Sequence, residues 1–130
     1  MFNFLYFFIM KKIFIILFIS VSSFVSYGSP EKIQMSDPNP QHNHYEFPVP
    51  ADQPDVYYDS DNQQIIIDGT GEVTYYDVEI ASVSTWTVVI STQVNGYYDT
   101  IDVSSLPTGE YCITIDSPTG NSFEGFFDTY

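Results

Sequence analysis

Positive charge is nearly absent from this chain of 130 residues. From Tyr45 to Tyr130 there is no Lys, Arg or His, while the same stretch carries fifteen Asp and Glu. The formal net charge of the whole chain is −14. So acidic a surface repels nucleic acid and anionic membranes, and we therefore expect no nucleic-acid partner.

Catalytic bases are equally scarce. The two histidines, His42 and His44, lie among prolines, and a base in irregular chain is not held within reach of a serine nucleophile. As metal ligands, two imidazoles without a third ligand make a weak site. A carboxylate pair for glycoside hydrolysis needs a separation of about 5 to 10 Å across a sugar-sized cleft, for which so short a domain has little room. We expect no enzymatic activity.

Cysteine is limited to Cys112, so no intramolecular disulfide can hold the fold. No cation lies near Cys112 in the sequence to lower the pKa of its thiol. We interpret it as a small strand residue.

Apolar residues are concentrated at the N-terminus. Lys11 and Lys12 precede the unbroken apolar run 13–19. Further along, Ser26 and Gly28 are small residues at positions −3 and −1 of a cut before Ser29. This pattern predicts a secretory signal peptide over residues 1–28 and a secreted protein, in the periplasm, at the outer surface or outside the cell.

Two alternatives concern the same segment. Met10 directly precedes the two lysines and is the more natural start of a signal peptide, so it is a candidate initiator. A single transmembrane anchor over residues 2–25 is the rival interpretation. It would place both lysines in mid-segment, where each is costly in hydrocarbon, and we expect no membrane insertion after cleavage.

Residues 29–55 have the composition of a proline-rich acidic linker. They hold six prolines, which lack a donor N–H and fix φ, so we expect mostly disordered, extended chain, with 45–49 as a candidate edge segment. After removal of the signal peptide, one positive charge (Lys32) and seventeen negative charges remain, −16 in all.

From residue 56 onward the hydrophobic period is two, which predicts strands. Short runs at even spacing, separated by turn residues, indicate a small all-β antiparallel sandwich of about six to seven strands over residues 56–130. The expected strands are 56–58, 63–68, 72–81, 85–94, 97–103, 111–116 and 123–128.

Asn95-Gly96 separates two of these runs. Asn-Gly is the strongest short-range hairpin signal, because a type I′ turn requires φ > 0 twice, so we expect 85–94 and 97–103 to pair. Most of the phenylalanines lie in the signal segment, so the core is expected to consist of Ile, Val and Tyr together with Trp86.

Aromatic residues occur as adjacent pairs, such as Tyr75-Tyr76 and Tyr97-Tyr98. Neighbours in a strand face opposite ways, so each pair should place about one ring in the core and one outside. An exposed tyrosine can stack on a sugar or anchor a protein partner. Tyr75, Tyr97 and Tyr98 are therefore the candidate binding residues, and strand filler is the plainer alternative.

Calcium is the one cofactor that the acids suggest. Asp55, Asp59 and Asp61 offer closely spaced hard oxygen ligands near the start of the domain. The segment lacks the glycine and the distal Glu of an EF-hand loop, and acidic turns without metal are the commoner case. We expect no other cofactor.

The stretch Ile101–Tyr111 reads Ile-x-Val-x-x-Leu-x-x-Gly-x-Tyr, and Gly125-x-Phe127 closes the chain. This pattern resembles a family of small secreted domains of unknown function from Bacteroidetes-type bacteria, with an immunoglobulin-like β-sandwich fold. It is more distantly similar to the C-terminal sorting domain of type IX secretion. The resemblance covers about residues 63–127, implies the fold and carries no catalytic residue. Unlike most sorting domains, this chain ends without a cation.

The Leu-x-x-Gly-x-Tyr spacing is also reminiscent of a tyrosine corner, which gives Gly109 and Tyr111 structural roles and directs the Tyr111 hydroxyl to turn backbone. For function, we expect a non-enzymatic exported module that contacts an envelope or extracellular protein or glycan through strand edges and tyrosines. The alternatives are a sorting or anchoring domain and a calcium-stabilised adhesion-type module.

Overall fold

A computed structural model describes residues 28–38 and 49–130 of the chain. Residues 1–27 of the predicted signal peptide, the two histidines and residues 45–48 of the candidate edge segment 45–49 lie outside these residues. In the described part, no helix is both long and apolar enough to cross a membrane.

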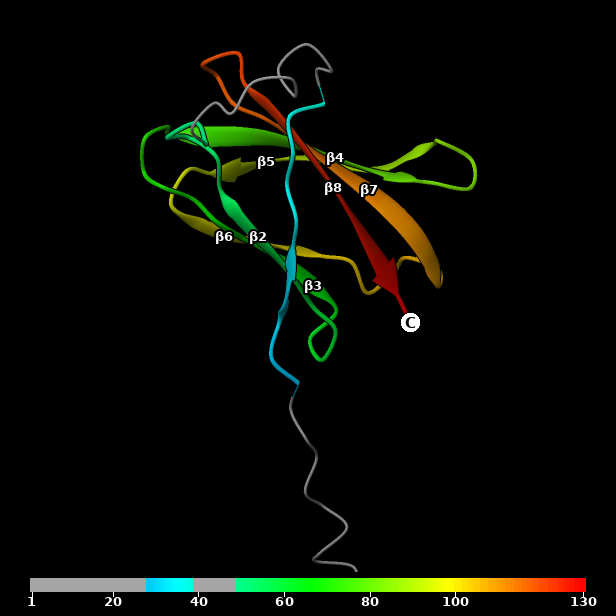
Figure 1. The fold of residues 1–130 in the computed structure, drawn as a ribbon. Coiled ribbons are helices and arrows are strands. Elements are labelled where there is room, and N and C mark those ends of the chain that lie inside the picture. The colour runs from blue at the N-terminus through cyan, green and yellow to red at the C-terminus, as the bar shows by residue number, and fades with distance from the viewer. Residues whose placement is uncertain (1–27, 39–48) are drawn as a thin grey trace, which may run out of the picture.

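Eight strands form two four-stranded antiparallel sheets (Figure 1). The first sheet has the order β1-β2-β3-β6 and the second the order β5-β4-β7-β8. The strands are β1 (Glu31–Ile33), β2 (Asp55–Asp59), β3 (Gln64–Asp68), β4 (Tyr75–Ser82), β5 (Val88–Asn95), β6 (Tyr98–Asp102), β7 (Gly109–Asp116) and β8 (Ser122–Thr129). The all-β sandwich predicted from the period of two is confirmed.

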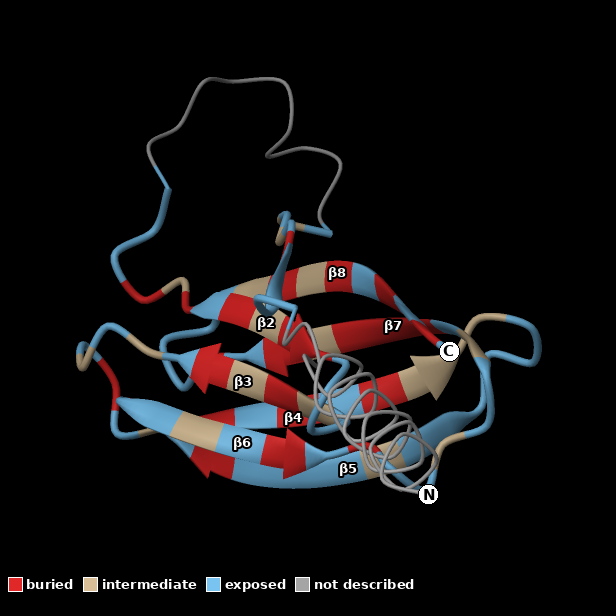
Figure 2. Ribbon diagram, turned by 90° about the horizontal axis from the view of Figure 1, so that it is seen from below, coloured by how far each residue is buried: buried red, intermediate tan, exposed pale blue. Residues whose placement is uncertain are grey.

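Alternation along the strands builds the core. In β4, Tyr76, Val78 and Ile80 are fully buried, while Asp77 and Glu79 between them are exposed. Figure 2 shows the same banding of buried and exposed residues along the neighbouring strands. Each fully buried aliphatic or aromatic side chain contributes about 1.5–3 kcal/mol, so these inward faces hold the two sheets together.

Strand β1 is a correction to the expected linker. Glu31–Ile33 pairs antiparallel with β2, and Ile33 is buried in the core. Beyond it, the Ser36 N–H donates to Glu124 O and the Glu124 N–H donates to Ser36 O, at 2.9 and 2.8 Å. The stretch 31–37 contains no proline and can therefore pair, although prolines stand on both sides of it.

Gly125 allows this segment to lie close to β8. A Cβ added at Gly125 would lie 2.6 Å from Ile33 Cγ2 and 2.7 Å from Met35 Sδ. Gly125 thus leaves the room that the N-terminal segment occupies between the edges of the two sheets (Figure 1).

The predicted Asn95-Gly96 hairpin is wrong. β5 pairs with β4 and β6 pairs with β3, so the chain crosses from one sheet to the other at this point. Neither residue has a positive φ. Instead, Asn95 Oδ1 accepts hydrogen bonds from the N–H groups of Tyr97 and Tyr98, each at 2.9 Å. The asparagine turns the chain through its side chain rather than through a type I′ backbone.

Trp86 does not belong to the core, contrary to expectation. It lies in the loop between β4 and β5 with φ 52° and is 64% exposed. Its N–H donates to Ser82 O at 2.6 Å, which closes a tight loop in place of the expected strand start. β5 begins two residues later, at Val88.

Gly96 is required by close backbone approach. Its N–H donates to Thr74 O at 2.9 Å, and an added Cβ would lie 1.7 Å from Val73 O. We expect Gly96→Ala to lower the free energy of unfolding by about 3 kcal/mol or more, because backbone atoms must move to make room.

The matched control is Gly109→Ala, where the added Cβ would lie 3.9 Å from the Tyr111 ring, an ordinary contact. Its effect in urea unfolding should stay within about 1 kcal/mol. Equal losses at the two positions would contradict the assignment.

Tyr111 makes the bond that the corner spacing predicts: its hydroxyl donates to Pro107 O at 2.5 Å, and its ring stacks on Phe127 with centroids 5.7 Å apart. Tyr111→Phe keeps the ring and removes the bond, so it should cost about 1 kcal/mol of unfolding free energy. A variant as stable as the wild type in chemical denaturation would show that the hydroxyl bond contributes nothing.

Candidate binding surface

The outer face of the first sheet carries two tyrosines, Tyr57 and Tyr98. Val56, Ile65 and Ile67 point into the core, so the intervening Tyr57 and Ile66 face outward. Tyr57 lies opposite Ile66 in the β2–β3 ladder. This places a tyrosine ring beside an aliphatic side chain on an outer sheet face.

A shallow groove of about 280 Å³ runs over this face. Its lining is Pro30, Tyr57, Ile66, Asp68 and Tyr98, a set that we call the tyrosine face. Tyr98 lies opposite Asp68 on β6 and is 55% exposed, while Tyr57 and Ile66 are half-buried. Two phenol rings and one aliphatic side chain therefore line a hollow with a carboxylate.

The charges beside the groove are mostly acidic. Asp55 and Asp68 lie directly opposite each other, which is unfavourable for like charges. The Lys32 Nζ lies 3.1 Å from Asp55 Oδ1, and this bond raises the pKa of the lysine. Asp68 remains as an acceptor at the groove, which favours a ligand with hydroxyl or cationic groups.

The three tyrosines predicted from the sequence are not brought together. Tyr98 lies on the tyrosine face, whereas Tyr75 belongs to β4 in the other sheet. Tyr97 lies in the connection between the sheets, close to Gly71. Tyr57 was not among the candidates. It is followed in the sequence by the buried Tyr58, so the two form an adjacent aromatic pair of the same kind as Tyr75-Tyr76 and Tyr97-Tyr98.

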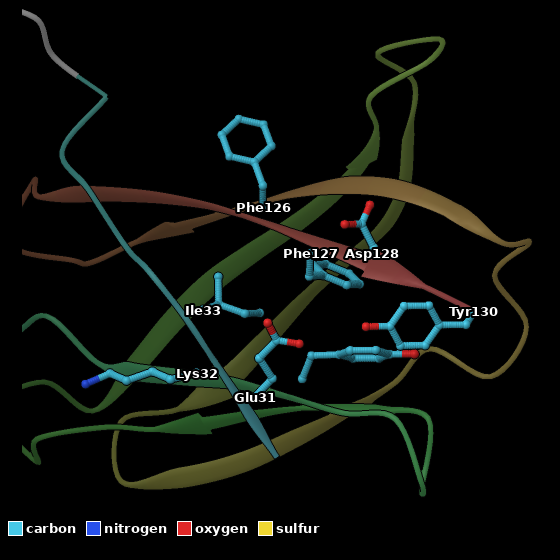
Figure 3. Close-up of a pocket in the computed structure, with 8 residues that line it drawn as sticks. Glu31, Lys32, Ile33, Phe126, Phe127, Asp128 and Tyr130 are labelled. Carbon is cyan, nitrogen blue, oxygen red and sulfur yellow. The ribbon is translucent and has the colours of Figure 1, made fainter. Parts of the chain in front are cut away.

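A second hollow, of about 110 Å³, lies between β1 and β8 (Figure 3). Glu31 and Asp128 both line it, together with Tyr58 and Tyr130. The ring centroids of the two tyrosines are 6.5 Å apart, and burial is the main cause that raises the pKa of Tyr58. The hollow is well below the usual size of a small-molecule pocket, about 300–1,000 Å³.

A third hollow, of about 710 Å³, separates the β4–β5 loop from the turn that begins at Pro107. Glu110 is the acid in its lining, which otherwise consists mostly of Ser, Thr, Val and Gly residues.

Of the three aspartates proposed as calcium ligands, Asp55 and Asp59 bind other partners, and Asp61 is exposed just beyond the end of β2. Asp59 accepts hydrogen bonds from Asn62 Nδ2 at 2.7 Å and from Gln64 Nε2 at 3.3 Å, and the Asn62 bond is the main cause that lowers the pKa of Asp59. Asp55 stands at the opposite end of β2 and pairs with Lys32. Among the described residues, no three His, Cys, Asp or Glu side chains are grouped to hold a metal.

Asp52, a further acid of the segment considered for calcium, is buried. Its carboxylate accepts hydrogen bonds from Thr119 Oγ1 at 2.6 Å and Asn121 Nδ2 at 2.9 Å, and its carbonyl accepts one from the Tyr76 hydroxyl at 2.7 Å. Burial is the strongest single effect on Asp52 and by itself would raise its pKa. The hydrogen bonds to the carboxylate together outweigh burial, so the pKa of Asp52 lies below its usual value.

Cys112 is a free, buried thiol. Burial is the main cause that raises its pKa, and Glu124 adds to the effect. A thiol so protonated is a poor nucleophile.

Comparison with solved structures shows the fold. The chain is similar to a DUF3244 family protein with an immunoglobulin-like β-sandwich fold from Bacteroides vulgatus, with a TM-score of 0.60 and 13% sequence identity over 78% of this chain and 100% of that chain. No family model matches the chain, and no curated protein matches it. The described domain is an immunoglobulin-like β-sandwich, and the similarity lends no support to a sorting domain.

Calcium provides a direct test of the acidic segment. Because Asp55 and Asp59 point to different partners, added Ca²⁺ should leave the melting temperature of the purified protein unchanged, relative to Mg²⁺ at equal ionic strength. A rise specific to Ca²⁺, removed by Asp59→Asn and by chelator, would reveal a site that the structure does not display.

Proposed function

We propose that this protein is a non-enzymatic, exported module that binds a protein or glycan of the cell envelope or exterior through the tyrosine face. The observation that carries the proposal is the groove in which Tyr57 and Tyr98 flank Ile66 on an outer sheet face. The signal-peptide pattern of residues 1–28 supports export.

The chemistry of the face supports recognition by stacking. A tyrosine combines an apolar ring with a polar hydroxyl, and it loses little conformational freedom on binding, so exposed tyrosines are efficient contact residues. Asp68 at the groove adds an acceptor for a hydroxyl or a cation. A nearly cation-free domain favours partners with positive or neutral surfaces and disfavours polyanions.

The remaining hollows support contact rather than catalysis. The hollow of about 110 Å³ that holds two carboxylates is below the usual size of a small-molecule pocket, and the hollow of about 710 Å³ holds a single carboxylate, Glu110. General acid–base catalysis requires a base within hydrogen-bond reach of a reacting group in a site that excludes water. A carboxylate pair in so small a hollow, and a single carboxylate in the larger one, support contact over such catalysis.

Capture from an envelope extract tests the proposal. The purified mature protein is immobilised, and bound proteins and glycans are identified by mass spectrometry and by carbohydrate analysis. Tyr98→Ser should reduce retention of the specific partner about tenfold or more, because a lost aromatic anchor typically costs over 1 kcal/mol. Tyr75→Ser, on the other sheet, is the matched control and should retain the partner.

Retention that is equal in the wild type and in Tyr98→Ser would remove the tyrosine face as the binding surface. Loss of the partner in Tyr75→Ser instead would indicate that the binding surface lies on the second sheet.

A further inference from the structure

The tyrosine face contains a carboxylate that the fold leaves without a cation. Asp68 lies directly opposite Asp55 in the β2–β3 ladder, and like charges in that position destabilise a sheet. The one salt bridge among the described residues joins Lys32 to Asp55, so no cation is bonded to Asp68. Asp68 is exposed at the groove, and a positive charge brought from outside would relieve the repulsion between the two aspartates.

An exposed aromatic ring stands beside the same carboxylate. Tyr98 lies directly opposite Asp68 in the β3–β6 ladder and is 55% exposed. Cβ atoms of directly opposite residues are about 4.5–5.5 Å apart, so a single ligand group can contact both side chains. A guanidinium group uses both contacts, because it stacks on an aromatic ring and donates two parallel hydrogen bonds to a carboxylate. A neutral sugar could stack on the ring but would leave the charge of Asp68 uncompensated.

The rest of the groove accepts an apolar side chain. Tyr57 and Ile66 lie opposite each other in the next row of the sheet on the same face, and Pro30 completes the lining. Ile66 is two residues from Asp68 along β3, and two residues of an extended ligand span the same distance because extended chains share one rise per residue. The groove therefore matches a segment that carries an arginine and an apolar residue two positions apart.

We propose that the ligand of the tyrosine face is an extended, basic segment of a polypeptide. Its arginine stacks on Tyr98 and bonds Asp68. An apolar side chain two positions away lies against Tyr57 and Ile66. The inference rests on the proposed function and narrows its partner from a protein or glycan to a protein with such a segment.

The charge of the whole domain acts in the same direction. Residues 29–130 hold one lysine, no arginine and seventeen acids. A field of this sign attracts a basic partner, increases its association rate and disfavours acidic competitors. The long-range charge and the local carboxylate at the groove thus select the same class of ligand.

Titration of the isotope-labelled mature protein with two synthetic peptides, followed by NMR, tests the inference. The first peptide is Gly-Ser-Arg-Ser-Leu-Ser-Gly with blocked ends, and the second replaces its arginine by citrulline, which has nearly the same shape and no charge. The arginine peptide should shift the amide signals of β3 and β6 and bind about tenfold or more tightly than the citrulline peptide. Its affinity should fall as salt is added, because salt screens exposed charges.

Asp68→Asn should weaken binding of the arginine peptide about tenfold, because the charge-assisted hydrogen bonds are lost. The matched control is Glu79→Gln, which removes one exposed charge from β4 in the other sheet and should leave the affinity within about twofold. Asp68→Asn should also be at least as stable in urea as the wild type, since it relieves the repulsion with Asp55. A purely structural role for Asp68 predicts a loss of stability instead.

An arginine peptide that does not bind, or that binds no more tightly than the citrulline peptide, would overturn the inference. So would equal losses of affinity in Asp68→Asn and Glu79→Gln.

Capture from the envelope extract separates this failure from a failure of the proposed function. If Tyr98→Ser loses the partner and Asp68→Asn retains it, the tyrosine face binds a neutral ligand such as a glycan. The proposed function then stands, and the basic segment is excluded. If both variants retain the partner, both proposals fail.

Discussion

The burial of apolar side chains between two sheets is the interaction on which this molecule depends. One cysteine cannot close a disulfide, and cations are almost absent, so covalent and ionic reinforcement are both minor. The inward positions of the strands are filled by Ile, Val, Tyr and Phe, which meet in one cluster. Because a domain of this size buries a modest core, each inward position matters to stability.

Hydrogen bonds to carboxylates and carbonyls take the place of salt bridges at the ends of the sandwich. Asp52 connects its loop to Thr119 and Asn121, and the Tyr76 hydroxyl bonds the backbone of the same loop. At another turn, the Tyr111 hydroxyl bonds Pro107. These bonds need no basic partner, so they are compatible with a strongly acidic composition and fasten loops that the core does not reach.

The same scarcity of cations shapes the tyrosine face on the first sheet. The one salt bridge among the described residues joins Lys32 to Asp55, and Asp68 stays beside the exposed Tyr98 without a cation. The composition that limits ionic reinforcement inside the fold therefore leaves a carboxylate open to a partner.

The sequence by itself determined which side chains face the core, because alternation is a local property: Tyr76, Val78 and Ile80 are buried as their period predicts. The Tyr111 corner was also readable from spacing. Tertiary structure alone decided which strands pair. It set β4 as the neighbour of β5, and it added Glu31–Ile33 to the first sheet as an edge strand. It likewise separated Tyr75 from Tyr98. The physical reason is that pairing depends on contacts between segments far apart in the chain, and Asn95-Gly96 specifies a change of direction without specifying the sheet that the chain enters next.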